Sequence, residues 1–235
     1  MQSVITLVIG FVTSVLLWFF FRPPFGKNVA RLNTDQKVVA LTFDDGPQPP
    51  YTDRLLDVLA KYNVKATFFV IGNRIEKYPE TSHRIIAEGH QIGNHSYTHP
   101  VLGCLPPIYV ERQIERTDKL LRQLGITEEI VFRAPMLTRF LPVAWVLAKG
   151  DRTHISCNVW GWDWITQNAD RIAKTVLRKV LSSTGAGSII VLHDGKAGNA
   201  DANRSGTVEA ADRIITALKQ EGYRFVRLSD VGNQS

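Results

Sequence analysis

Two neighbouring carboxylates follow a short apolar run near the start of the chain. The run 38–43 is followed by Asp44 and Asp45, and Gly46 and Pro47 come next. An Asp-Gly turn with two solvated carboxylates is frequent and needs no function. At the end of a buried strand, however, both side chains can reach one site and take different roles there. We therefore treat Asp44 and Asp45 as candidate catalytic or metal-binding groups.

A pair of histidines, His95 and His99, is the second chemical signal. Residues four apart share one face of a helical turn, where two imidazoles can bind one metal ion. Pro100 follows, so we expect no more than a single turn here. Two surface histidines are the simpler interpretation. A metal site would need a carboxylate as third protein ligand, which either Asp44 or Asp45 can supply.

Three more polar residues lie at or just after other predicted strands. Arg133, Asp163 and His193 would each fit an ordinary role, as a surface ion pair, a loop carboxylate and a capping histidine. Their shared position at strand ends favours a common site, because the catalytic residues of α/β folds gather at the carboxyl ends of strands.

Three tryptophans surround Asp163 in the sequence, at positions 160, 162 and 164. Large aromatic side chains pack well in protein cores, and they also form the stacking surfaces that bind carbohydrates. The sequence leaves both interpretations of these tryptophans open.

The elements that would position these residues alternate along the chain. Strands are predicted for runs rich in β-branched and aromatic residues: Val38–Phe43, Ala66–Ile71, His90–Gly93, Ile130–Arg133, His154–Trp160, Ser188–His193 and Arg224–Leu228. Helices are predicted for Tyr51–Tyr62, Pro79–Glu88, Pro107–Leu124, Ala169–Leu181 and Thr207–Gln220. This alternation predicts an α/β fold with a parallel sheet and covering helices. Seven strands favour a closed or nearly closed barrel over an open sheet.

Composition limits the class of protein. The chain has 235 residues, of which 44% are hydrophobic, and this excludes whole-chain disorder and suits one domain. The formal net charge of +6 suits an anionic partner, but no basic run or motif supports nucleic-acid binding. The two cysteines, Cys104 and Cys157, form no Cys-x-x-Cys motif, and whether they pair is left open.

The N-terminal segment carries no charge from Val4 to Phe21. As a helix it would span about 27 Å, close to the roughly 30 Å hydrocarbon thickness of a bilayer. We expect residues 1–21 to be a transmembrane anchor or an uncleaved signal segment. Residues 22–35 read as a linker, which leaves 36–235 as the catalytic domain. The basic residues that follow the segment favour a cytoplasmic C-terminus by the positive-inside tendency.

Taken in order, the motifs resemble those of the polysaccharide deacetylases, carbohydrate esterase family 4. They are Thr42-Phe43-Asp44-Asp45-Gly46-Pro47, His95-x-x-x-His99, Arg133-x-Pro135, Asp163-Trp164 and Leu192-His193-Asp194. The resemblance runs from about residue 38 to residue 228. It implies a distorted (β/α) barrel that hydrolyses N-acetyl, sometimes O-acetyl, groups on glycans such as chitin oligomers, peptidoglycan or xylan.

The resemblance also assigns a metal site. Asp45, His95 and His99 would be the ligands of a divalent cation. Zn²⁺ is our first choice, although two imidazoles and one carboxylate also accept Co²⁺, Ni²⁺, Mn²⁺ or Fe²⁺.

By the same resemblance, Asp44 would be the general base, oriented by Arg133. His193 would be the general acid, paired with Asp163. Trp164 and Leu192 would shape the acetyl pocket, and a backbone N–H near Met136 would contact the substrate as an oxyanion donor.

The third motif departs from the family pattern. The family shows Arg-Pro-Pro-aromatic-Gly where this chain has Arg133-Ala134-Pro135-Met136-Leu137, which puts the shape of the substrate site in doubt. A membrane-tethered, inactive carbohydrate-binding protein of the same fold is therefore an alternative, as is an O-acetyl (xylan-type) esterase. A metallopeptidase is disfavoured because Ser96, not glutamate, follows His95. We expect a monomer that acts outside the cytoplasm, where acetylated envelope glycans lie.

Overall fold

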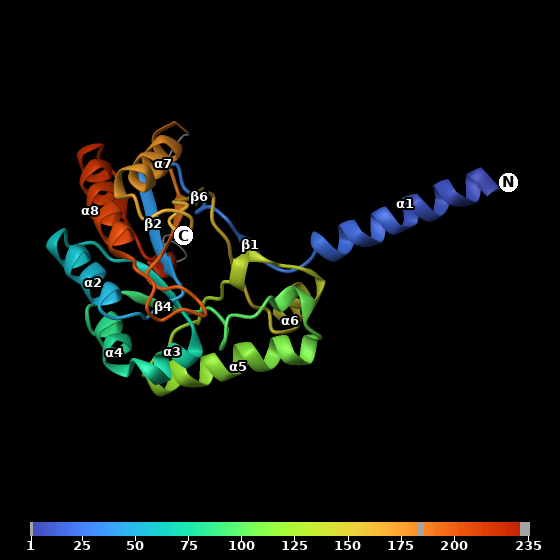
Figure 1. Ribbon diagram of the computed structural model, residues 1–235, viewed down its shortest axis with the longest axis horizontal. Coiled ribbons are helices and arrows are strands. Elements are labelled where there is room, and N and C mark those ends of the chain that lie inside the picture. The colour runs from blue at the N-terminus through green and yellow to red at the C-terminus, as the bar shows by residue number, and fades with distance from the viewer. Residues whose placement is uncertain (1, 183–185, 231–235) are drawn as a thin grey trace.

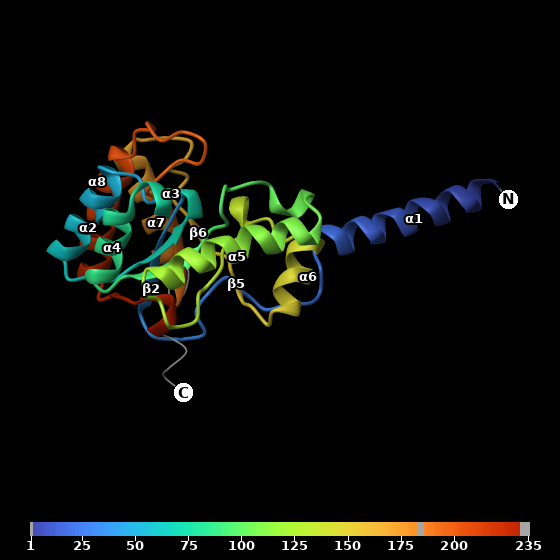
Figure 2. The same cartoon turned by 90° about the horizontal axis from the view of Figure 1, so that it is seen from below.

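The computed structural model describes residues 2–182 and 186–230. Helices gather around a central sheet, and the N-terminal helix α1 (Gln2–Phe21) extends away from this body (Figure 1; Figure 2). In the figures, α2, α4, α7 and α8 lie on one side of the sheet, while α5 and α6 lie at the end nearer α1.

The sheet is built around one fully buried strand, β2 (Val38–Asp44). It pairs in parallel with β3 (Thr67–Val70) on one side and with β7 (Ser188–His193) on the other. Outside these lie β4 (Gln91–Asn94) and β6 (Val159–Trp160), and β8 (Arg224–Phe225) pairs with the first residues of β2. The register sets Asp44 opposite His193, so two of the predicted site residues leave adjacent strands at the same level.

The predicted barrel is not closed by strand hydrogen bonds. Beyond β4 the parallel pairing continues only through Phe132, which bridges Asn94 on one side and His154 on the other. The predicted strand Ile130–Arg133 is thus reduced to one bridging residue. Its continuation is interrupted at Pro135, which has no N–H donor, and at Met136 and Leu137, which both have positive φ values.

The predicted strand His154–Trp160 is divided into two short pieces. The first, β5 (His154–Ile155), pairs with β1 (Asn28–Val29), while β6 pairs with β7. The fold class is therefore α/β with a parallel, barrel-like sheet that stays open between β5 and β6 among the described residues.

All five helices predicted for the domain are present, with bounds within one or two residues of the prediction. They are α2 (Tyr51–Lys61), α4 (Pro79–Ala87), α5 (Pro107–Gln123), α7 (Ala169–Ser182) and α8 (Ser205–Gln220). Two were not predicted, α3 (Gly72–Lys77) and α6 (Leu141–Lys149), and three short 3₁₀ turns cover Leu102–Cys104, Pro135–Leu137 and Leu228–Asp230. The main core lies between β2, β3 and β7 and the apolar faces of α2, α7 and α8.

The N-terminal region differs in part from expectation. Across the residues that the structure describes, no helix is both long and apolar enough to count as a membrane span, so the predicted anchor gains no support. Within the predicted linker, Asn28–Val29 form β1 and Leu32 is 6% exposed, so this stretch packs on the domain. Cys104 and Cys157 are both free thiols.

The aromatic core supports a stability prediction. Phe68 is fully buried and stacks on Phe43 with ring centroids 5.1 Å apart. We expect Phe68→Ala to lower the free energy of unfolding by about 3–5 kcal/mol, because the truncation leaves a cavity. Urea unfolding followed by circular dichroism measures the change. Ile108→Ala, at a half-exposed position of α5, is the control and should change stability by less than about 0.5 kcal/mol. Equal losses in the two variants would contradict this description of the core.

Candidate active site

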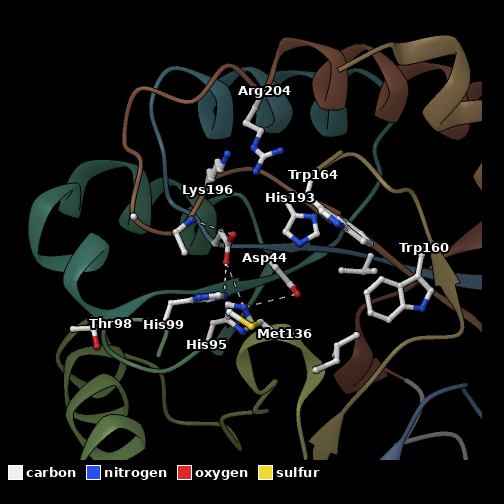
Figure 3. Close-up of a pocket in the computed structure, with 15 residues that line it drawn as sticks. Asp44, His95, Thr98, His99, Met136, Trp160, Trp164, His193, Lys196 and Arg204 are labelled. Carbon is white, nitrogen blue, oxygen red and sulfur yellow. Dashed lines mark hydrogen bonds and ion pairs between the residues drawn. The ribbon is translucent and has the colours of Figure 1, made fainter. Parts of the chain in front are cut away.

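A pocket of about 740 Å³ opens at the carboxyl ends of the strands. Its walls come from the loops after β2, β4, β6 and β7 and from the 3₁₀ turn at Pro135–Leu137 (Figure 3). The lining residues include Asp44, Asp45, His95, His99, Met136, Trp160, Trp164, His193, Lys196 and Arg204. Residues separated by up to 160 positions in the chain therefore share one cavity, as expected for a parallel sheet.

Asp45, His95 and His99 converge on one point of the pocket. One potential ligand atom from each lies within 4.8 Å of the others. Asp45 Oδ1 is 3.1 Å from His99 Nε2 and 3.5 Å from His95 Nε2. Of the two candidate carboxylates, Asp45 is the one that completes the three-ligand set.

The hydrogen bond behind His95 fixes the tautomer of its ring. His95 Nδ1 lies 2.9 Å from the backbone carbonyl oxygen of Arg133. A carbonyl oxygen only accepts, so Nδ1 carries a proton, and the other ring nitrogen, Nε2, is turned toward Asp45. Metal-binding histidines are commonly oriented in this way by a partner on the second ring nitrogen.

The carboxylate of Asp45 is only partly hydrogen-bonded. Its Oδ2 accepts from the backbone N–H of Ala197 at 3.2 Å. Its Oδ1 is buried and has no hydrogen-bond partner among the described residues. Burial acts to raise the pKa of Asp45, but the imidazoles of His95 and His99 outweigh it and hold the pKa well below its usual value. An ionised carboxylate with two imidazole nitrogens beside it in a buried space is a donor set that fits a divalent cation.

The histidine loop is not the helical turn that we predicted. Ser96 and His99 have positive φ values, and residues 95–100 form an irregular bend. Side chains replace the helical hydrogen bonds: Ser96 Oγ accepts from His99 N–H, and Gln113 on α5 accepts from the N–H groups of Tyr97 and Thr98. Strained backbone held by such bonds is frequent at functional sites.

Asp44 forms a buried ion pair with Arg133. Arg133 Nη1 donates to Asp44 Oδ1 at 2.6 Å, and both residues are at most 4% exposed. The guanidinium also donates to Thr42 Oγ1 and to the carbonyl oxygens of Ile155 and Ser156. A guanidinium held by four hydrogen bonds fixes the direction of the carboxylate that it binds.

His193 is paired with Asp163 at the other side of the pocket. Its Nδ1 is 2.9 Å from Asp163 Oδ1, and its backbone N–H donates to Asp163 Oδ2 at 2.7 Å. Burial acts to lower the pKa of His193, but the negative charge of Asp163 outweighs it and raises the pKa to about 9. The same pairing lowers the pKa of Asp163 against the effect of its own burial. The pair is therefore an imidazolium and a carboxylate at neutral pH.

The apolar wall of the pocket comes from Trp160, Trp164, Met136 and Leu137. Trp164 packs edge-on against His193 at 5.3 Å, and Met136 is 61% exposed. Trp162 stacks on Trp160 and is 48% exposed. The tryptophans thus form a surface cluster rather than a core.

Leu192 does not line the pocket. Successive residues of a strand face opposite sides, so Val191 and His193 face the cavity while Leu192 packs into the core. A β-carbon at Gly161 would lie 2.3 Å from its side chain. Val191, which our sequence analysis did not name, occupies the place expected for Leu192.

Lys196 and Arg204 also line the pocket, and neither was predicted from the sequence. Asp194 belongs to the fifth motif, but no role was assigned to it. Asp194 accepts a hydrogen bond from Thr52 at 2.6 Å, and its burial raises its pKa to about 7. Arg204 immediately precedes α8 and lies in the segment that follows β7. Its position after a strand that carries a site residue is the sequence signal that could have indicated a role in the pocket.

The comparisons with known proteins agree with this geometry. The sequence profile described as "Polysaccharide deacetylase" matches residues 31–149. The chain is 38% identical over 201 residues to the Bacillus subtilis protein named "Peptidoglycan-N-acetylmuramic acid deacetylase PdaC". The matched region covers 85% of this chain and 40% of that protein. It thus spans less than half the length of that relative.

Two solved structures are similar in fold. A crystal structure of a peptidoglycan N-acetylglucosamine deacetylase superposes with a TM-score of 0.78 at 34% identity, covering 87% of this chain and 92% of the other. A Bacillus anthracis protein described as a pseudoenzyme of carbohydrate esterase family 4 superposes with a TM-score of 0.77 at 26% identity. The match covers 88% of this chain and 69% of the other. The fold thus occurs both in a protein named a deacetylase and in one described as a pseudoenzyme.

The ligand set generates a prediction about metal binding. We expect Asp45→Asn to weaken Zn²⁺ binding by at least about 100-fold. Of the three proposed ligands, Asp45 is the one whose negative charge attracts the cation, and the substitution removes that charge. Isothermal titration calorimetry of the metal-free chain measures the affinity. His83→Ala, at an exposed histidine away from the pocket, is the matched control and should bind as the wild type does. Unchanged affinity in Asp45→Asn would place the ion elsewhere.

Proposed function

The chain belongs to the polysaccharide deacetylase family, and we propose that it hydrolyses N-acetyl groups on an envelope glycan, with peptidoglycan as the first candidate and chitooligosaccharides as the second. One observation carries the proposal. A three-ligand cation site lies in the same pocket as a carboxylate held by arginine and an imidazolium held by aspartate. Metal-assisted amide hydrolysis uses these three components together.

Asp45, His95 and His99 would hold the cation, for which Zn²⁺ is our first choice. When bound, a divalent ion lowers the pKa of a coordinated water and polarises a carbonyl oxygen. Two neutral imidazoles and one carboxylate would leave a net positive charge for that purpose. The donor set alone does not select zinc over Co²⁺, Ni²⁺, Mn²⁺ or Fe²⁺.

Asp44 would act as the general base. It accepts the proton of the water that attacks the acetyl carbonyl carbon. Arg133 holds one carboxylate oxygen at 2.6 Å, which leaves Oδ2, on the side of His95, to receive the proton. Arg133 touches neither water nor substrate in this scheme and acts through the orientation of Asp44.

His193 would act as the general acid. The C–N bond of the amide breaks readily only when the nitrogen is protonated, because the deprotonated amine (RNH⁻) is a poor leaving group. His193 donates the proton that its Nε2 carries, the amine leaves, and acetate remains. Asp163 keeps the imidazole protonated before this step and in a fixed orientation.

The tryptophan cluster supports a glycan as substrate. Trp160 and Trp164 line the pocket, and Trp162 extends the aromatic surface outside it. Flat aromatic faces beside a polar centre suit sugar rings, whose C–H faces are apolar. Met136, exposed at the entrance, would contact the substrate there.

Two alternatives stay open for the same pocket. The altered third motif and the similar fold of a protein described as a pseudoenzyme favour an inactive glycan-binding protein as the second candidate. The third is an O-acetyl esterase. Acetate release from peptidoglycan, chitooligosaccharides and acetylxylan separates them, because the binding protein would release none and the esterase would act on acetylxylan alone.

We also propose that the domain acts outside the cytoplasm. This location rests on where acetylated envelope glycans lie. The basic residues after position 21 favour the opposite orientation, so a protease-accessibility assay on intact cells is the direct test.

The assigned base and acid give a first kinetic prediction. We expect Asp44→Asn and His193→Ala each to lower kcat for acetate release by about 10²–10⁴-fold, because each removes one proton-transfer group. Circular dichroism and zinc content confirm that the variants are folded and loaded. His83→Ala serves again as the control. Near-wild-type turnover in either variant would refute the role given to that residue.

The raised pKa of His193 gives a prediction about pH. The acid must be protonated, so kcat is retained below a pKa of about 9 and lost as the pH rises through it. Asp163→Asn removes the charge that raises this pKa, and the alkaline limb of the pH profile should move toward about 6.5, the ordinary value for histidine. Steady-state kcat, measured across the neutral and alkaline range, gives the alkaline limb of the wild type and that of the variant. A limb that stays in place in Asp163→Asn would contradict the assignment.

A further inference from the structure

The Asp163–His193 pair is held from a third element, the start of α8. Thr207 Oγ1 donates to Asp163 Oδ2 at 2.9 Å, and Arg204 Nη1 donates to the backbone carbonyl oxygen of Asp163 at 3.2 Å. Thr207 is fully buried and Arg204 is 3% exposed. Neither residue belongs to the five motifs, and no step of the proposed mechanism uses either one.

Thr207 helps to fix the orientation of the Asp163 carboxylate toward the imidazole. Asp163 Oδ2 accepts both the hydroxyl of Thr207 and the backbone N–H of His193. Oδ1 is left for His193 Nδ1. Rotation of the carboxylate would break all three hydrogen bonds, so its plane is fixed with one oxygen aimed at the ring.

Arg204 ties together the two chain segments that carry the pair. Its Nε donates to the carbonyl oxygen of Gly195 at 2.7 Å, just after β7, while Nη1 reaches Asp163 after β6. Gly206 shows how closely α8 approaches the loop after β6, because a β-carbon there would lie 1.9 Å from the carbonyl oxygen of Gln167. The spacing between Asp163 and His193 is thus bridged by one buried guanidinium.

We propose that Thr207 and Arg204 are positioning residues for the proposed acid, Thr207 through the carboxylate of Asp163 and Arg204 through the backbone on both sides of the pair. The catalytic meaning of this inference rests on the proposed deacetylase function. The link between Thr207 and the ionisation of His193 does not, because it follows from hydrogen bonding and charge alone.

Several charged groups face His193 and set its ionisation. Asp163 after β6 and Asp44 and Asp45 at the end of β2 favour the imidazolium, while burial opposes it. On the α8 side, Arg204 favours the ionised form of Asp163. Loss of the Thr207 hydroxyl leaves Asp163 Oδ2 with one donor, so the carboxylate is less firmly oriented and its hydrogen bond to the imidazolium weakens.

The test compares Thr207→Val, which keeps the branched shape without the hydroxyl, with Thr207→Ser, which keeps the hydroxyl. Nuclear magnetic resonance titration of ¹³C-labelled histidine in the full-length, zinc-loaded chain gives the pKa of His193. We expect a fall of about one pH unit in Thr207→Val and the wild-type value in Thr207→Ser, since a hydrogen bond to a charged group has that size. Thr175→Val is the matched control, because the Thr175 hydroxyl donates only to the carbonyl of Arg171 on its own helix.

Kinetics provide the second measurement. In Thr207→Val the alkaline limb of kcat should move down with the pKa of His193, with KM changed by less than about twofold because substrate contacts are kept. Arg204→Lys keeps the charge but lacks the fork that spans both carbonyls, and it should lower kcat in the same way. An unchanged kcat in Arg204→Lys would remove Arg204 from the proposal.

The outcomes separate this inference from the proposed function. Absence of acetate release by the wild type would reject the deacetylase, while the titration of His193 would still decide the role of Thr207. A His193 pKa equal in Thr207→Val and wild type would overturn the inference. An equal fall in Thr207→Val, Thr207→Ser and Thr175→Val would also overturn it, because the hydroxyl would then not be the cause.

Discussion

The site depends on three potential metal ligands, Asp45, His95 and His99, that lie close together in the pocket. One oxygen of the buried Asp45 carboxylate lies within 3.5 Å of the Nε2 atoms of His95 and His99, and the other ring nitrogen of His95 donates to the carbonyl of Arg133. A carboxylate and two imidazole nitrogens placed together in this way form a donor set that divalent cations take. The strained backbone at Asp45 and His99, both with positive φ, holds the ligands in this position. The pocket therefore contains a candidate site for a divalent ion.

The remaining charges are arranged around that centre in two separate pairs. Arg133 holds Asp44 from the side of β5, and Asp163 holds His193 from the side of β6. Each pair places one charge in the pocket and its partner behind it. One pair therefore presents a carboxylate and the other an imidazolium within the same cavity. An acid and a base can coexist in this way without neutralising each other, because each is stabilised by its own neighbour. The parallel register of β2 and β7 makes this possible, since it places Asp44 level with His193.

Much of this could be predicted from sequence, because the site residues lie at or just after apolar runs and the carboxyl ends of parallel strands meet. The failures have physical reasons. His95 and His99 were expected on a helical turn, but side-chain hydrogen bonds from Ser96 and Gln113 stabilise a bend instead. Leu192 was expected in the pocket, although the alternation of β7 already excludes it once His193 faces the cavity. Barrel closure depends on pairing between distant strands, and Pro135 interrupts the strand expected after Ile130. Thr207 is 44 residues from Asp163, and no local pattern connects them.

The most direct test is anomalous diffraction at the zinc edge from crystals of the zinc-loaded chain. A single peak is expected in the pocket, at about 2.0–2.2 Å from a carboxylate oxygen of Asp45 and from Nε2 of both His95 and His99. A peak bound by other residues, or zinc held by only one of these three side chains, would contradict the account of the centre.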